Sequence, residues 1–313
     1  MSKLYLECYS GISGDMTVGA LLGLGADRGK LEEALASVPA EGFHIQISQV
    51  LKSGIEAWDF DVILDEAHEN HDHDMEWLFG AAAEAPHVHG DGHVHSHGEA
   101  SCCHGVKEEC TVESDQGEHH GHEGHLSHDA HHHEGHHHEH RNLQQVYDIL
   151  DRTQMSENAR ALAKRIFRIV AEAEAEVHGK PIGEVHFHEV GAIDSIADII
   201  AIAVCYDDLQ VRENITEAIV PVLYEGTGTV RCQHGILPIP VPAVAAIARS
   251  HGLRLHIMPD AGEFVTPTGA AVAAALRTGD SLPAEFVIKK NGLGAGKREY
   301  KRAGILRAML LEG

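Results

Sequence analysis

The feature that most limits how this chain can fold is a central stretch, residues 68–140, that cannot build a hydrophobic core. It holds 21 of the 28 histidines in the 313-residue chain, with 16 acidic residues and a single basic one. Its apolar residues are few and scattered, apart from a short patch at 75–79. Such a segment does not bury enough apolar surface to offset the entropy lost on ordering. We therefore predict a disordered, His-rich insertion between two folded parts, 1–67 and 141–313.

Both flanks alternate short β-like runs with amphipathic α-like runs. Leu162, Ile166 and Ile169 share one helical face, and this helix is predicted to end at Gly179, before Pro181. Other helices are predicted at 15–24, 193–209, 241–250 and 268–277, and strands at 3–9, 44–50, 58–64, 185–190, 218–224, 253–258, 285–289 and 305–311. This order predicts an α/β or α+β fold, a layered sheet-and-helix body that both flanks build together and that the insertion interrupts.

The charge and hydropathy of the chain argue against nucleic acid and membranes as its binding partners. The chain has 24 Lys and Arg against 48 Asp and Glu, a formal charge of −24, which repels phosphate backbones and argues against nucleic acid. No run approaches the ~20 apolar residues of a membrane span, and the N-terminus carries no signal-peptide pattern. Six cysteines without a Cys-x-x-Cys pair indicate reduced thiols. We expect a cytoplasmic protein that binds no membrane.

The insertion has the composition of a metal-binding segment. Its densest run, 131–140, sets neutral imidazoles beside carboxylates, and imidazole binds nickel, copper, zinc and iron alike. Binding needs unprotonated imidazole, whose pKa is about 6.5, so it should weaken in acid. Without fixed geometry such a segment suits collection and transfer of ions better than catalysis, and a solvated segment without ligand is the alternative. The predicted ligands here are His131, His132, His133, His136, His137, His138 and His140.

A second candidate metal site lies in the folded part. On a strand, His186 and His188 would project from one face, with Glu189 at the strand end. Asp194 and Asp198 are four residues apart, which places both on one face of the helix that follows. Mixed imidazole and carboxylate ligands at such a junction predict a fixed metal site. In the alternative, Asp194 caps the helix, Asp198 faces solvent and the histidines form local hydrogen bonds, and the residues alone leave both open.

Two further segments open predicted helices. Ser-Gly-Ile-Ser-Gly-Asp15-Met follows a strand, but it lacks the Gly-x-x-x-x-Gly-Lys-Ser/Thr pattern of a phosphate loop. Asp15 would also repel a phosphate from the helix start, so capping or metal contact is the better interpretation. The run from Thr266 through Thr268 has the composition of a helix start, with simple capping as the alternative to a ligand-binding role.

Two glycine-rich segments complete the candidates. Residues 291–298 offer three glycines followed by Lys297 and Arg298, a combination suited to an anionic group, with a solvated hairpin turn as the alternative. Residues 228–242 form a predicted rigid loop in which His234 stands between glycine and proline residues. Such a loop can line a pocket.

Five segments, in this order, carry a family resemblance. They are SGISGDM, HFHEVGAIDSIADI, GTGTVRCQHGILPIPVPA, TPTGAA and GLGAGKR. Together they resemble the nickel-insertion proteins of nickel-pincer cofactor biosynthesis, the LarC family, and the resemblance runs from Ser10 to about Arg307. It implies CTP-dependent insertion of Ni(II) into pyridinium-3,5-bisthiocarboxylic acid mononucleotide, with formation of a nickel–carbon bond, to give the cofactor of lactate racemase and related enzymes.

One hypothesis built on this resemblance assigns a role to each candidate. The insertion collects Ni²⁺, the ligands predicted in the folded part hold it, and Asp15 accepts the proton that leaves the pyridinium carbon. The cofactor precursor is bound by Thr266, Thr268, Lys297 and Arg298, of which the last two receive its phosphate. A second hypothesis is a non-catalytic nickel store or metallochaperone. A third, an unrelated nucleotide hydrolase, lacks the phosphate loop it would need.

The chain also departs from the family pattern. By resemblance, family members continue beyond the last predicted strand into a C-terminal domain that binds CTP with a divalent cation, whereas this sequence stops at Gly313. We therefore expect the CTP site to lie outside this sequence, either in a C-terminal polypeptide supplied in trans or in a part that the sequence has lost. A pincer-dependent racemase or epimerase is the implied recipient of the finished cofactor.

Overall fold

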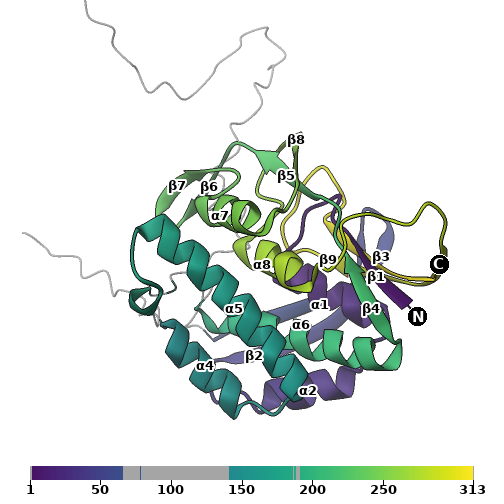
Figure 1. Ribbon diagram of the computed structural model, residues 1–313, viewed down its shortest axis with the longest axis horizontal. Helices are drawn as coiled ribbons and strands as arrows, with labels where there is room; N and C mark the ends of the chain where they lie inside the picture. Colours follow the sequence, from purple (N-terminus) through teal and green to yellow (C-terminus); the bar gives the residue numbers. More distant parts are fainter. Residues whose placement is uncertain (1, 66–77, 79–140, 186, 188–190, 313) are drawn as a thin grey trace, which may run out of the picture. The chain divides into compact units, whose positions relative to one another are not determined.

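One mixed β-sheet is built from both flanks of the sequence (Figure 1). The computed structural model describes residues 2–65, 78, 141–185, 187 and 191–312, so the predicted insertion lies outside the described residues except for Leu78. The strands, in their order across the sheet, are β2 (Phe43–Lys52), β3 (Ile55–Leu64), β9 (Val287–Ala295), β10 (Ile305–Glu312), β1 (Ser2–Glu7) and β4 (Ile215–Ile219). β1 pairs antiparallel with β10 and parallel with β4. The N-terminal strand therefore lies between two strands of the second flank.

The residues of β1 alternate between the two faces of the sheet, as the two-residue period of a strand requires. Leu4 and Leu6 belong to the main core, whereas Tyr5 belongs to a small separate cluster with Met309 and Leu311. Tyr5 lies opposite Met309 in the β1–β10 ladder. The main core therefore forms on the face that carries Leu4 and Leu6.

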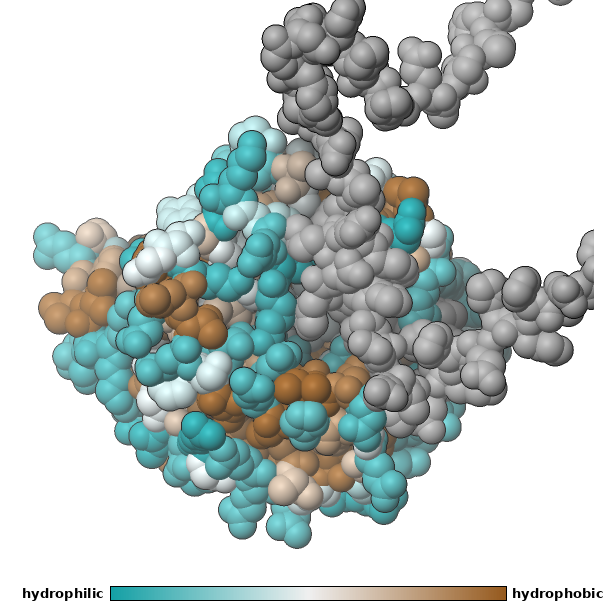
Figure 2. Space-filling model, turned by 180° about the vertical axis from the view of Figure 1, so that it is seen from behind, coloured by the Kyte–Doolittle hydropathy of each residue, from teal (hydrophilic) through white to brown (hydrophobic). Residues whose placement is uncertain are grey.

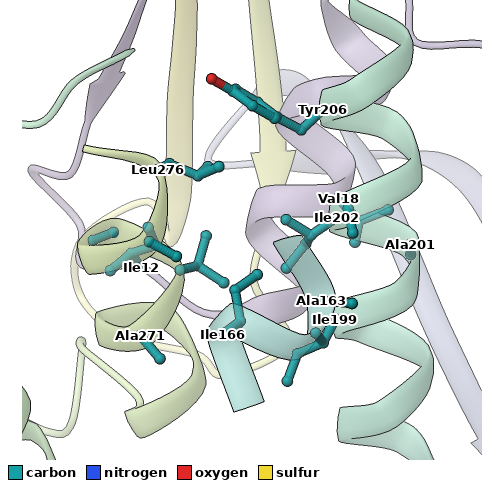
Figure 3. Close-up of a cluster of buried hydrophobic side chains, with 14 of the residues drawn as sticks. Ile12, Val18, Ala163, Ile166, Ile199, Ala201, Ile202, Tyr206, Ala271 and Leu276 are labelled. Atoms are coloured by element: carbon teal, nitrogen blue, oxygen red, sulfur yellow. The ribbon is translucent and has the colours of Figure 1, made fainter. Parts of the chain in front are cut away.

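Helix α1 lies directly on the sheet, and further helices pack behind it. In chain order the helices are α1 (Gly14–Gly23), α2 (Arg28–Ala36), α4 (Leu143–Arg152), α5 (Glu157–His178), α6 (Ile193–Arg212), α7 (Pro242–His251) and α8 (Pro267–Leu276), with a 3₁₀ turn at Ile182–Glu184. α1 contacts β3, β9 and α6, and α5 contacts α6, α7 and α8. Figure 3 shows Val18 of α1, Ile166 of α5 and Ile202 of α6 in the core, and all three are fully buried. Each such side chain contributes about 1.5–3 kcal/mol through burial.

The predicted helices are confirmed, and α2 and α4 are additional. Several helix ends carry residues that commonly occupy these positions. The Ser156 hydroxyl accepts a hydrogen bond from the Ala159 N–H (3.0 Å) at the start of α5. The same helix ends at Gly179, whose φ of 60° is in the left-handed region. Helices α7 and α8 each begin with proline. These are the residue types that satisfy free backbone groups at helix termini or lack an N–H there.

Glycines in β9 allow α1 to lie close against the sheet. A Cβ atom at Gly292 would lie 2.1 Å from the carbonyl oxygen of Ala20, and one at Gly294 would lie 1.9 Å from that of Met16. The alternative of a solvated hairpin turn at 291–298 is therefore wrong for its first five residues, which belong to β9, and the predicted binding of an anionic group stays a prediction. These glycines serve close helix–strand packing, and the two cations follow the strand.

Two other segments differ from the prediction. The predicted strand at 218–224 is two strands in different sheets, because Pro221 lacks the N–H that a ladder needs. β4 belongs to the large sheet, whereas β5 (Leu223–Thr227) pairs with β8 (Leu255–Ala261). The predicted rigid loop at 228–242 contains a hairpin, formed by β6 (Thr229–Cys232) and β7 (Gly235–Pro238).

The predicted strand at 185–190 is wrong at the two positions that the structure describes. Neither Val185 nor Phe187 belongs to a strand. The Phe187 N–H donates to the carbonyl oxygen of Arg141 (3.0 Å), and the Phe187 ring lies 6.1 Å from that of Phe167 between centroids. At these two described positions the chain is therefore held by a loop contact and by side-chain packing and not by a strand ladder.

These elements confirm the predicted α/β or α+β class, while the division into 1–67, 68–140 and 141–313 stays a prediction. Within the described ranges, no helix is both long enough and apolar enough to cross a bilayer. Seen from behind, most of the described surface is hydrophilic, with a few separate hydrophobic patches (Figure 2).

Candidate functional site

A cavity of about 150 Å³ lies where the first turns of three helices meet. Its wall contains residues from the starts of α1, α6 and α8, from β3, and from the segment after β9. The sequence-predicted residues in this wall are Asp15, Asp194, Asp198, Thr266, Thr268, Lys297 and Arg298. The fold therefore gathers candidates from both flanks of the chain around one space.

Asp198 is the carboxylate most affected by its surroundings. Burial raises its pKa well above the usual value, the charges of Asp15 and Asp194 raise it further, and Lys297 opposes the shift. Its Oδ2 atom packs against the start of α1, where a Cβ atom at Gly14 would lie only 2.1 Å away. Carboxylates that crowd in this way favour binding of a cation, which stabilises their ionised forms.

Asp15 and Asp194 occupy first turns without capping their helices. The cap position of α1 is Ser13, whose hydroxyl donates to Asp15 Oδ1 and makes no capping bond. The cap position of α6 is Ala192. The alternative in which Asp194 caps the helix is therefore wrong, and Asp198 lines the cavity and does not face open solvent.

The two predicted anion-binding cations already have carboxylate partners. Lys297 Nζ lies 2.6 Å from Asp59 Oδ1 and 3.4 Å from Asp61 Oδ2. Arg298 pairs with Glu263. Sequence analysis missed these three acids, since their partners are distant in the chain. A phosphate would have to share both cations with the protein, so their predicted role in receiving it stays a prediction.

The capping alternative for Thr266 is confirmed. Its hydroxyl accepts a hydrogen bond from the Gly269 N–H (3.1 Å), and its own N–H donates to the carbonyl oxygen of Ile12 (3.1 Å). Thr268 is buried in the first turn of α8. With α1 and α6, three helix N-termini border the cavity, and N-termini attract anions through free N–H groups and the helix dipole.

A buried carboxylate behind the cavity was also missed. Oε1 of Glu225 in β5 accepts hydrogen bonds from the N–H groups of Gly226 (2.8 Å), Phe264 (2.8 Å) and Val265 (3.2 Å). Burial raises the pKa of Glu225 to about 7, although these hydrogen bonds oppose the shift. Its Oε2 atom is buried and has no hydrogen-bond partner in the described part of the chain. Glu225 therefore fixes the loop that leads to Thr266, and an acid within a short strand pattern was the only sequence signal.

Comparison with known proteins shows the family to which this chain belongs. Residues 4–313 match the family described as "Nickel insertion protein". The chain belongs to the nickel insertion protein family. The resemblance predicted from five segments is thereby confirmed. No solved structure matches the chain.

Curated relatives match this chain over nearly its whole length. A "Pyridinium-3,5-bisthiocarboxylic acid mononucleotide nickel insertion protein" from Alkaliphilus metalliredigens is 45% identical over 312 residues, which are 99% of this chain and 61% of the relative. Proteins of the same name from Acetivibrio thermocellus and Clostridium acetobutylicum are 34% and 37% identical, over 99% and 100% of this chain and 60% and 64% of those relatives. The chain thus spans about three fifths of the length of the curated relatives it matches.

Several of the predicted metal ligands lie outside the described residues. They are His186, His188, Glu189, His131, His132, His133, His136, His137, His138 and His140. Within the described ranges, no group of three or more His, Cys, Asp or Glu side chains is arranged to hold a metal ion. Asp194 and Asp198 therefore supply at most part of a coordination sphere, and their role as ligands stays a prediction.

Proposed function

We propose that this chain is the nickel-inserting part of an enzyme, a lyase or chelatase, that adds Ni²⁺ to pyridinium-3,5-bisthiocarboxylic acid mononucleotide and yields the nickel-pincer cofactor. The observation that carries the proposal is the cavity at which carboxylates from both flanks and three helix N-termini converge. Such a wall suits a divalent cation together with an anionic group of a substrate. The names of the relatives support the choice of substrate.

In this proposal Ni²⁺ is the substrate that the carboxylates receive. Asp194 and Asp198 supply oxygen ligands, and the charge of the ion counteracts the raised pKa of Asp198. His186, His188 and Glu189 supply the remaining ligands. Carboxylate oxygen is a harder ligand than the thiocarboxylate sulfur of the precursor, so nickel passes from the protein to the sulfur atoms.

The next step forms the nickel–carbon bond. Nickel acts as the electrophile at the pyridinium carbon between the two thiocarboxylate groups, the C–H bond breaks, and its electron pair forms the bond to nickel. The proton passes to Asp15, which acts as general base. The Ser13 hydroxyl donates to Asp15 Oδ1 and so holds this carboxylate in one orientation.

The helix ends bind the anionic part of the precursor. Thr266 and Thr268 lie at the start of α8, and Lys297 and Arg298 lie in the same wall. Because both cations are already paired with acids, backbone N–H groups of the first turns supply much of the attraction for a phosphate. A cavity of about 150 Å³ admits part of a mononucleotide, and the rest extends outside it.

The remaining components of the proposal lie beyond the described cavity. The histidines of the insertion collect Ni²⁺, and a separate C-terminal polypeptide binds CTP with a divalent cation. A pincer-dependent racemase or epimerase receives the product. A cytoplasmic location fits the free thiols of Cys8 and Cys205.

Activation of apo lactate racemase tests this function. The precursor, Ni²⁺ and CTP are supplied with this chain alone, and then with a C-terminal partner polypeptide. Nickel insertion is supported if racemase activity appears with the wild-type chain and is absent with the Asp15→Asn variant. Nickel binding without activation under either condition contradicts it and favours the store or metallochaperone, which the histidine-rich composition also suits.

A further inference from the structure

A second cavity, of about 290 Å³, lies beside the first and has a different lining. The two cavities share Glu263, Pro267 and Arg298 in their walls. The second cavity is bordered by the end of α5, by the hairpin β6–β7 and by the start of α7, and Figure 1 shows this hairpin next to the end of α5. The family function proposed above uses none of its other residues.

Besides Glu263, which pairs with Arg298, four side chains with metal-ligating atoms line this second cavity: Glu174, His178, Cys232 and His234. His178 Nε2 lies 3.2 Å from Glu174 Oε2. Cys232 Sγ lies 3.9 Å from His234 Nδ1, and the rings of His178 and His234 are 4.9 Å apart between centroids. The cluster therefore joins one helix to the hairpin through a carboxylate, two imidazoles and a thiol.

These separations are close to those of ligands on one metal ion. With bond lengths of about 2.3 Å to sulfur and about 2.0 Å to nitrogen, two such ligands of a tetrahedral ion lie about 3.5 Å apart, and two imidazole centroids lie about 5 Å apart. No three of the described donors yet surround a common point, so a short side-chain movement is needed. His234 is exposed on the hairpin, and exposed side chains change rotamer within nanoseconds.

Partial burial distinguishes the α5 half of this cluster, His178 and Glu174, from an ordinary surface ion pair. The side chains of His178 and Glu174 are only 24% and 14% exposed. Imidazole and thiolate together select transition metals over Mg²⁺ or Ca²⁺, which prefer oxygen. The nearby charges are Arg231 and the Arg298–Glu263 ion pair, so a cation here is balanced by Glu174 and by an ionised Cys232.

The position of Leu78 connects this cavity to the histidine-rich sequence. Leu78 is 3% exposed and lies in the wall of the second cavity. In the sequence it stands directly before the part of the insertion that holds most of the histidines. A described residue adjacent in sequence to the histidine-rich part therefore lies in the wall of the second cavity, which shares residues with the cavity that we assign to insertion.

We infer that Glu174, His178, Cys232 and His234 form a second binding site for a divalent transition-metal ion, through which Ni²⁺ passes between the histidine-rich segment and the first cavity. The transfer role rests on the proposed function, but the capacity to bind metal does not. The site is a binding site only, and no covalent step occurs there.

Co²⁺ alone is a suitable probe, because thiolate ligation gives a sulfur-to-metal charge-transfer band. The insertion contains Cys102, Cys103 and Cys110, so the full chain is used with these three replaced by serine. In that background we expect one equivalent of Co²⁺ to give the band, and Cys232→Ser to abolish it. His178→Gln and His234→Gln should each weaken this binding about tenfold or more, since loss of groups that merely orient ligands costs 10- to 100-fold.

His256→Gln serves as the matched control, because His256 lies outside both cavities. It should leave the band and the affinity unchanged, and circular dichroism should show that every variant is folded. A band that persists in Cys232→Ser, or an affinity unchanged in both cavity histidine variants, overturns the inference. If the variants lose metal binding in the second cavity but still activate the racemase, only the transfer role is overturned. If the second cavity binds metal but the racemase is not activated, this inference stands and the proposed function is contradicted.

Discussion

The two cavities share a wall but differ in donor chemistry. The first is lined by carboxylates at helix starts, including Asp15 and Asp198, whereas the second brings together imidazoles and a thiol, with His178 and Cys232 among them. Imidazole and thiolate bind nickel more tightly than carboxylate does. A sulfur atom of the substrate therefore displaces oxygen ligands from nickel more easily than it displaces imidazole or thiolate. In the function that we propose, capture and release of the ion therefore occur in separate sites, which share the Arg298–Glu263 pair.

The largest effect that separates the cavities is expected from Asp15→Asn. Removal of a general base should lower nickel insertion by about 10²- to 10⁴-fold, as measured by racemase activation. The Co²⁺–thiolate band of the second cavity should keep its intensity. If both readouts fall together, the two cavities are one functional unit.

Glu225→Gln tests the support behind the first cavity through stability. Because the folded-state pKa of Glu225 is raised to about 7, its stabilising contribution is complete below the unfolded-state value of about 4.5 and is lost as pH rises to about 7. Relative to wild type, the variant should therefore gain about 3 kcal/mol between pH 4 and pH 8. The charged and titratable groups nearby are Glu263, Arg298 and Tyr300, and the Tyr300 pKa, raised to about 12 mainly by burial, keeps it neutral there.

Urea denaturation at several pH values measures this difference. Asp280→Asn, at a residue outside both cavities, is the control and should show no such trend. A difference between wild type and Glu225→Gln that stays constant with pH contradicts the assignment of this titration to Glu225.

Gly14→Ala should displace Asp198 without removing any donor. The added Cβ atom would lie 2.1 Å from Asp198 Oδ2, so the carboxylate must shift. A misplacement of this kind should lower nickel insertion by about 10- to 100-fold, with metal binding in the second cavity unchanged. Gly183→Ala is the matched control, since nothing lies within 4 Å of its Cβ position. Equal activity in the two variants would show that the position of Asp198 is unimportant.

The smallest effect on insertion is expected from replacing residues 79–140 with a short Gly/Ser linker. The amount of Ni²⁺ retained in dialysis should fall sharply, because most histidines are removed. Activation at saturating Ni²⁺ should change by no more than about twofold, since a segment without fixed geometry supplies no catalytic centre. Complete loss of activation in a folded variant would show that residues 79–140 supply groups needed for the reaction.

Local patterns in the sequence were sufficient for most of the helices. The apolar stripe and Gly179 predicted α5, and a proline after threonine predicted α8, because periodicity and caps act within a few residues. Glycines were harder to interpret. Gly292 and Gly294 have the composition of an anion loop, yet they lie in a strand because α1 packs on them from the other flank.

The candidate residues were predictable, but their meeting was not. Asp15 and Asp198 come from helices on opposite sides of the insertion, and only the packing of α1 against α6 brings them together. The partners of Lys297 and the buried contacts of Glu225 likewise depend on segments distant in the chain. Short-range sequence patterns do not predict contacts between distant segments. The second cavity, and the wall that it shares with the first, were therefore not predictable from the sequence.

The place of β1 between β10 and β4 in the sheet governs when the fold can be completed. Its neighbours, β4 and β10, are synthesised more than 200 residues after it, so the ribosome releases the histidine-rich segment long before the sheet can close. Pairings between such distant strands form slowly, because a long loop must be closed first. During translation, therefore, the histidine-rich segment is synthesised before the acidic cavity can exist.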